Sequence, residues 1–151
     1  MTIEILVDAD ACPVRAEVYR VAERYGVKVF VVSGQLIAIP QSPLIERAIV
    51  GDKFDAADDW IAARAGPRSI VVTADIPFAQ RAIAAGAVAI GPTGKPFTRD
   101  SIGMAMATRE LMTQLRAMGE ITGGPKAMAG KDKSRFLSAL DEAVNRLRRQ
   151  G

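Results

Sequence analysis

The sequence predicts an α/β protein built around a mainly parallel sheet. Over residues 1–91, short apolar runs rich in β-branched residues alternate with segments whose apolar residues recur at helical spacing. This alternation is typical of repeated βα units. Aspartates follow directly after several of the apolar runs, where parallel strands would reach their carboxyl ends. Together the two observations predict strands that are joined by helical crossovers.

The first βαβ unit occupies the opening fifth of the chain. Residues 3–8 form a short apolar run that predicts a buried strand, and Pro13 suits the first turn of a helix over 13–25 that Gly26 closes. A second β-branched run follows over 27–33. Crossovers of this kind are right-handed almost without exception, so we expect the two strands to be parallel.

The rest of the α/β part continues the alternation after one irregular stretch. Pro40 and Pro43 interrupt residues 34–50, so we expect only a short strand near 48–50 there. The pattern then predicts a helix over 55–65, a strand over 69–73, a helix over 76–84 and a last strand over 87–90.

After the last predicted strand the pattern changes to helix alone. Apolar-periodic segments over 102–118 and 136–147 predict two helices with a glycine-rich segment between them. Neither helix looks self-sufficient, so we expect both apolar stripes to pack on the α/β part. We therefore expect one domain over residues 1–151, with an α/β core over 1–91 and a basic helical extension over 92–151.

Composition excludes some chemistries and favours others. The chain contains no histidine, which excludes mechanisms that need an imidazole as base, nucleophile or metal ligand. Residues 1–93 carry 9 basic and 11 acidic side chains, whereas residues 94–151 carry 11 and 6. This split suits an acidic site beside a surface that attracts phosphate, although solvated helix faces would explain it equally well.

Cysteine usage and hydropathy point to the compartment. Cys12 is the single cysteine and cannot form an internal disulfide, and the N-terminus runs into a strand pattern without the features of a leader peptide. No apolar run approaches the ~18 residues of a membrane span. We therefore expect a soluble, cytoplasmic protein, in which Cys12 is a small buried or capping residue rather than a nucleophile.

Aspartates gather at the edge of the predicted sheet where ligands bind. Asp8 and Asp75 come directly after strands, Asp10 lies two residues beyond Asp8, and Asp55 and Asp58 share one side of a helix's first turn. One such aspartate is often only a helix N-cap, but several in one pocket repel each other unless a cation neutralises them. Hard oxygen ligands suit Mg²⁺ or Mn²⁺. We expect Asp8, Asp58 and Asp75 to bind the metal, with Asp55 as a fourth catalytic acid and Asp10 as an auxiliary group.

Hydrolysis of a phosphodiester by a metal-activated water is the reaction that best fits such a site. Thr73 is a further auxiliary candidate, because its hydroxyl could reach a metal or phosphate, although strand-end threonines are more often structural. The basic C-terminal part would hold the nucleic-acid backbone. Its candidate residues are Arg109, Arg116, Gly123, Gly124, Lys131, Lys133 and Arg135. Solvated arginines and a glycine linker are the ordinary alternatives.

Four motifs spread over the chain are distinctive when taken together. They are Val7-Asp8-Ala9-Asp10-Ala11-Cys12-Pro13, the segment 51–61 with Phe54-Asp55-Ala56-Ala57-Asp58, Thr73-Ala74-Asp75-Ile76-Pro77, and Gly123-Gly124-Pro125. They resemble the uncharacterised bacterial YaiI/YqxD family, which is similar to the PIN-like superfamily of metal-dependent nucleases. The resemblance implies a three-layer α/β/α fold and a ribonuclease activity. It matches Asp8 to the first strand-end acid, Asp55 and Asp58 to the mid-chain acids, and Asp75 to the acid of a Thr-x-Asp motif.

The sequence departs from the PIN-like pattern at one position and leaves two alternative functions open. Many PIN-like nucleases carry a second acid two residues after the one matched by Asp75, where this chain has Pro77; Asp10 or Asp52 could substitute for it. The first alternative is a phosphatase of the haloacid-dehalogenase type, whose aspartyl-nucleophile motif resembles residues 8–10. There Asp8 would attack phosphorus and Asp10 would act as acid and base. The second is a non-catalytic module that binds metal or RNA.

Overall fold

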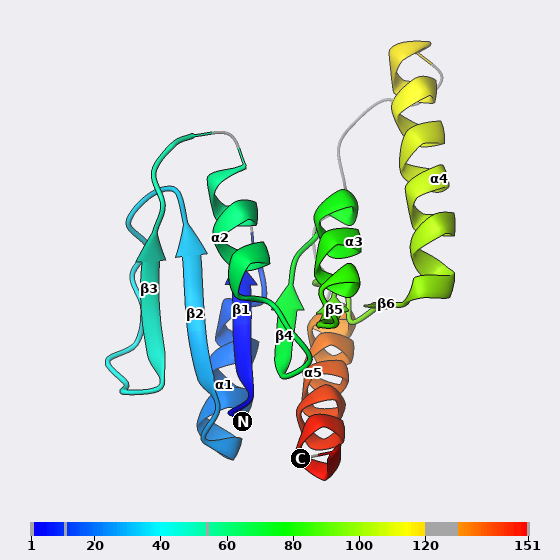
Figure 1. The fold of residues 1–151 in the computed structure, drawn as a ribbon. Helices are drawn as coiled ribbons and strands as arrows, with labels where there is room; N and C mark the ends of the chain where they lie inside the picture. Colours follow the sequence, from blue (N-terminus) through cyan, green and yellow to red (C-terminus); the bar gives the residue numbers. More distant parts are fainter. Residues whose placement is uncertain (1, 11, 54, 120–129, 151) are drawn as a thin grey trace.

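The computed structural model describes residues 2–10, 12–53, 55–119 and 130–150, which form a sheet with helices on both faces (Figure 1). The strands are β1 (Glu4–Asp8), β2 (Lys28–Ser33), β3 (Ile45–Ile49), β4 (Ser69–Val72), β5 (Val88–Ile90) and β6 (Pro96–Phe97). They lie in the order β3-β2-β1-β4-β5-β6. The first five are mutually parallel, and β6 pairs antiparallel with β5.

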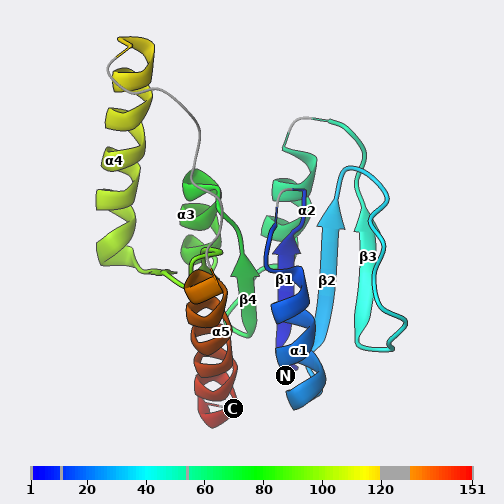
Figure 2. The ribbon, with the colours of Figure 1, turned by 180° about the vertical axis from the view of Figure 1, so that it is seen from behind.

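The helices complete a three-layer α/β/α arrangement. They are α1 (Arg15–Tyr25), α2 (Ala56–Arg64), α3 (Ile76–Ala84), α4 (Arg99–Ala117) and α5 (Gly130–Gln150). Figures 1 and 2 show α2 and α3 on one face of the sheet and α1 and α5 on the other, while α4 stands beside α3 and extends beyond it. The predicted fold class is therefore confirmed.

Two apolar clusters hold the layers together, one on each face of the sheet. Side chains alternate between the faces of a strand, so Ile5 and Val7 of β1 pack with α1 and α5, whereas Leu6 packs with α2 and α3. All three are fully buried. Burial on both faces explains why the central strands are almost continuously apolar in the sequence.

Most predicted elements lie where the pattern placed them, and three differ. Helix α5 spans Gly130–Gln150 rather than 136–147, because its mostly exposed ends lack the apolar period that marks its buried middle. Strand β3 covers Ile45–Ile49 rather than a short segment near 48–50, because it pairs with β2 from Val29 to Ser33. Strand β6 lies beyond the predicted last strand. It has two residues, too few to show a period, and Pro96 is tolerated because it begins an edge strand.

The two C-terminal helices pack on the α/β part to very different degrees. Helix α5 buries four side chains along its length: Phe136, Leu140, Val144 and Leu147. Helix α4 buries Ile102 near its start, against α3, but Leu111 is 53% exposed. In the described part of the chain, no helix is both long and apolar enough to cross a membrane.

The same substitution should therefore change stability to very different extents on the two helices. We expect Leu140→Ala to lower the free energy of unfolding by about 2–5 kcal/mol, because it opens a cavity in the core. Leu111→Ala is the matched control on α4 and should change it by less than about 0.5 kcal/mol. Urea denaturation measures both, and equal losses would show that α4 is as firmly docked as α5.

Candidate active site

The strand order places a topological switch point between β1 and β4. From β1 the chain proceeds outward through β2 and β3, and it then returns to the other side of β1 to form β4 and β5. The connections after β1 and β4 thus leave in opposite directions, and doubly wound sheets bind ligands in the crevice that this creates. Asp8 ends β1 and Thr73 follows β4 directly. The fold therefore carries both residues to the position that favours a ligand.

Thr73 connects the two strand ends by hydrogen bonds. Its Oγ1 donates to Oδ2 of Asp8 at 2.9 Å and accepts from the backbone N–H of Asp75 at 3.0 Å. Asp75 in turn caps α3, because its Oδ1 accepts from the N–H of Phe78 at 3.0 Å. Thr73 is 2% exposed, so little solvent competes for its hydroxyl. The hydrogen bond from this hydroxyl therefore positions the carboxylate of Asp8.

Proline at position 77 has a structural explanation. Helix α3 begins at Ile76, so Pro77 lies in its first turn, where the backbone N–H has no partner within the helix and a proline is tolerated. Asp75 supplies the cap that begins this turn. Pro77 therefore serves to start the helix.

Helix α2 contributes two more carboxylates, from Asp55 and Asp58. Asp55 has φ of 62° and is the single non-glycine residue at positive φ in the described part of the chain. It stands at the N-cap of α2, yet its side chain makes no capping hydrogen bond. Such backbone conformations cost roughly 1–3 kcal/mol and concentrate at functional sites. Asp58 lies in the first turn of the same helix.

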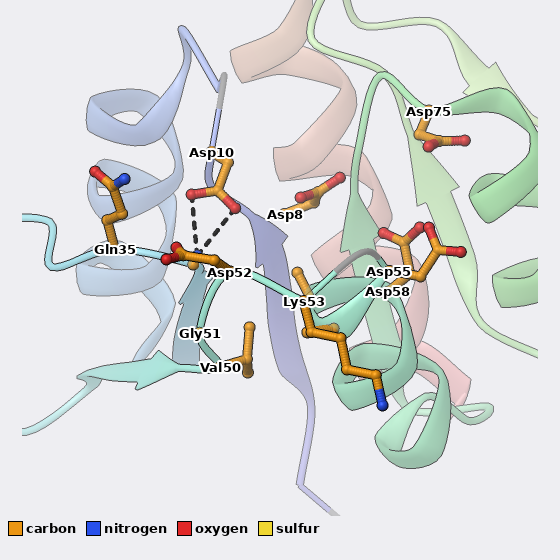
Figure 3. A pocket seen from close by; sticks show the side chains of 13 residues that line it. Asp8, Asp10, Gln35, Val50, Gly51, Asp52, Lys53, Asp55, Asp58 and Asp75 are labelled. Carbon is orange, nitrogen blue, oxygen red and sulfur yellow. Dashed lines mark hydrogen bonds between the residues drawn. The ribbon is translucent and has the colours of Figure 1, made fainter.

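These acids line one cavity of about 530 Å³ at the carboxyl edge of the sheet (Figure 3). The structure thus brings together Asp8, Asp10, Asp55, Asp58 and Asp75, as the sequence predicted, and adds Asp52 and Lys53 from the loop before α2. From the sequence, Asp52 was a candidate only to replace the acid absent at position 77, and Lys53 was not a candidate. No spacing rule could have found Lys53, because its place depends on how the loop folds over β2.

Crowding of like charges is visible in the pKa values of the acids. The pKa of Asp58 is raised to about 6. Burial is the largest cause, the carboxylates of Asp8, Asp75 and Asp55 add to the rise, and Arg81 opposes it. Burial also raises the pKa of Asp8, with Asp10 and Asp75 adding to the rise and the hydrogen bond from Thr73 opposing it. The cavity therefore favours bound positive charge.

Asp10 has a structural task in this arrangement. The backbone N–H of Gly34 donates to Oδ1 at 3.1 Å and to Oδ2 at 3.0 Å (Figure 3). A Cβ on Gly34 would lie 2.9 Å from the carbonyl oxygen of Gly51, so only glycine fits between the two loops. This shared hydrogen bond links the carboxylate of Asp10 to the loop after β2.

A second cavity, of about 950 Å³, lies between α4 and the end of the sheet. It shares Asp8, Asp10 and Asp75 with the first cavity. Arg109 and Arg116 line it, as do Thr73 and several residues that sequence analysis did not single out: Lys95, Pro96, Phe97, Met104 and Met112. Their common surface arises only when α4 docks, so no local pattern could have revealed it.

Other candidates lie outside both cavities. Lys131, Lys133 and Arg135 are exposed on the first turns of α5 and are not among the described residues that line either cavity. Arg135 lies 3.9 Å from a carboxylate oxygen of Asp132. Gly123 and Gly124 lie outside the described residues.

Cys12 borders the second cavity and is partly buried. Burial raises the pKa of its thiol, so the sulfur stays protonated near neutral pH and is a poor nucleophile and metal ligand. Among the residues that the structure describes, no three Asp, Glu or Cys side chains are already arranged around a single metal position.

Fold and site define a doubly wound α/β protein with an acidic cavity at its switch point. A family model described as "Uncharacterized BCR, YaiI/YqxD family" matches residues 6–146, and the chain belongs to this family. The UPF0178 protein of Nitrobacter winogradskyi is 61% identical over 97% of this chain and 94% of its own length. The UPF0178 protein of Bradyrhizobium diazoefficiens is 59% identical over 97% and 87%. No solved structure matches the chain.

We expect Asp58→Asn to stabilise the metal-free protein at pH 8. The pKa of Asp58 is raised from 3.8 to about 6 by folding. The protonated side chain thus contributes stability below the unfolded pKa, and this contribution is lost as the pH rises through the folded pKa. The side chain is partly exposed and screened by solvent. The free energy of unfolding of Asp58→Asn should therefore exceed that of the wild type by about 1 kcal/mol at pH 8 and by a small fraction of that near pH 4.

Urea denaturation in EDTA at both pH values measures this gain. Asp59→Asn is the matched control, because Asp59 is exposed and forms an ion pair with Arg81 at 3.3 Å. A gain of equal size at pH 4 and pH 8 would contradict the electrostatic explanation.

Proposed function

We propose that this protein is a divalent-metal-dependent nuclease that hydrolyses phosphodiester bonds in RNA. The observation that carries the proposal is the convergence of Asp8, Asp58 and Asp75 on one cavity from three separate elements. The six aspartates that line this cavity repel each other, and a cation is the natural way to relieve that repulsion. We favour RNA over DNA as the substrate because the family is similar to PIN-like nucleases, a similarity that implies ribonuclease activity.

The donor set fits Mg²⁺ or Mn²⁺. The chain has no histidine, and Cys12 is kept as a thiol, so carboxylate oxygens are the ligands that the cavity offers. Mg²⁺ is usually held by one or two carboxylates, with waters and substrate phosphates completing its coordination. Among the described residues, no three acidic side chains are preset around a single metal position, which is compatible with a mode in which waters and phosphates supply most of the ligands. Asp8, Asp58 and Asp75 would hold the ion, and Asp55 lies beside them in the same cavity.

When bound, the cation would lower the pKa of a water molecule and neutralise charge on the phosphate. The chain's own residues prepare this chemistry. Thr73 orients the carboxylate of Asp8, and Asp75 is held by its capping bond at the start of α3. Burial and the neighbouring carboxylates raise the pKa of Asp58 to about 6. A bound cation would therefore stabilise the ionised form of Asp58, which the metal-free cavity disfavours.

The alternatives make different demands on the site. A phosphatase of the haloacid-dehalogenase type needs Asp10 as a general acid at the reacting phosphate, whereas the structure holds the Asp10 carboxylate against the backbone N–H of Gly34. This hydrogen bonding favours hydrolysis by water over attack by Asp8. A non-catalytic module would bind RNA and Mn²⁺ through the same residues and leave the RNA intact.

The decisive experiment compares the wild type with Asp8→Asn on mixed-sequence RNA and single-stranded DNA in Mn²⁺. We expect the wild type to cleave RNA, and we expect Asp8→Asn to cleave it about a hundredfold more slowly or worse, because one metal ligand is lost. Asparagine keeps an oxygen that can accept the hydroxyl of Thr73, so the fold should be retained.

Asp59→Asn is the matched control and should cleave at the wild-type rate, because Asp59 pairs with Arg81 and does not line the cavity. Calorimetric titration with Mn²⁺ complements the assay. A wild type that binds no divalent ion and cuts neither substrate would rule the nuclease out, whereas metal and RNA binding without cleavage would support the non-catalytic module.

A further inference from the structure

The cavity between α4 and the sheet carries three basic side chains. Lys95 comes from the loop between β5 and β6, and Arg109 and Arg116 come from α4. The ion pairs formed within the described residues include none of the three. Basic groups that line a cavity and form no ion pair within the described residues favour an anionic ligand.

The same cavity also has an apolar surface. Phe97 lines it from β6, and Met104 and Met112 line it from α4. Met104 is 73% exposed, so its thioether is open to a ligand. Methionine side chains are polarisable and adapt to varied ligand shapes. A ligand that suits this cavity therefore has both negative charge and apolar surface.

The apolar and basic wall continues into the acidic cavity. Asp8, Asp10 and Asp75 line both, so a ligand that extends along α4 ends beside the proposed metal ligands. A chain of alternating phosphates and bases has this chemistry. A duplex does not, because its bases are paired inside and it presents mainly phosphates and sugars to the wall.

We propose that the groove between α4 and the sheet binds single-stranded nucleic acid and leads it to the acidic cavity. Lys95, Arg109 and Arg116 bind its phosphates. Phe97, Met104 and Met112 contact the faces of its unpaired bases. This inference rests on the proposed function for the identity of its ligand, and it assigns substrate binding to α4 rather than to the basic start of α5.

The test is the binding of a 5′-fluorescein-labelled 12-nucleotide RNA of mixed sequence, measured by anisotropy in EDTA so that no cleavage occurs. We expect Arg109→Ala/Arg116→Ala to weaken binding at least tenfold. The dependence of log K on log salt should become shallower by about 1.4, because each contact with a single-strand phosphate contributes about 0.7. A perfectly paired RNA duplex should compete at least tenfold less well than the unlabelled single strand.

Matched variants make the result specific to the groove. Arg99→Ala removes a cation from α4 that lines neither cavity and should bind RNA as the wild type does. Met112→Glu adds an acid to the apolar wall and should weaken binding to a similar extent as the double arginine variant. A loss no larger than that of Arg99→Ala would overturn the inference. A larger loss in Lys131→Ala/Lys133→Ala, or equal competition by the duplex, would also overturn it.

Kinetics in Mn²⁺ separate this inference from the nuclease proposal. If the protein is a nuclease, the double arginine variant should lose activity through a raised KM rather than through kcat. Cleavage with an unchanged KM would overturn the groove and leave the nuclease standing. Arginine-dependent binding by a wild type that cleaves nothing would support the groove and defeat the nuclease.

Discussion

The parallel pairing of β1 with both β2 and β4 is the constraint on which the rest of the structure depends. It buries Ile5, Leu6 and Val7 completely, and it leaves Asp8 to emerge between two connections that turn in opposite directions. Register matters because the side-chain period of a strand is two. A slip of one residue would send Leu6 to the opposite face and would carry Asp8 away from Thr73. The geometry of the acidic cavity therefore follows from the packing of the core strands.

The acidic cavity is assembled against electrostatic repulsion, and local hydrogen bonds help to hold it. Thr73 fixes Asp8, the start of α3 fixes Asp75, and the loop after β2 fixes Asp10. Asp55 sits in a strained backbone conformation. Stability comes instead from the apolar clusters on the two faces of the sheet. This separation lets the edge of the sheet carry groups that are unfavourable for the folded chain but suited to binding a cation.

Helices α4 and α5 have different roles in the C-terminal part: α5 packs in the core, and α4 lines a cavity. Helix α5 uses its apolar stripe, including Phe136 and Leu140, to complete the core beside α1. Helix α4 buries Ile102 and leaves other apolar side chains on the wall of a cavity that also carries Arg109 and Arg116. Acidic and basic surfaces thus meet at Asp8 and Asp75. A phosphate chain with a divalent cation is complementary to both surfaces.

The sequence by itself determined the class of fold and indicated the main aspartates of the acidic cavity. Helix α3 matches its predicted bounds, and Gly26 caps the end of α1 as predicted. Local apolar period and capping residues specify such elements. Asp8 and Asp75 were predictable for a similar reason, since parallel strands end at one edge of a sheet. Only the tertiary structure decided the bounds of β3, the structural task of Asp10, and the groove formed by Lys95, Arg109 and Met112. These depend on contacts between segments far apart in the chain, which no local pattern records.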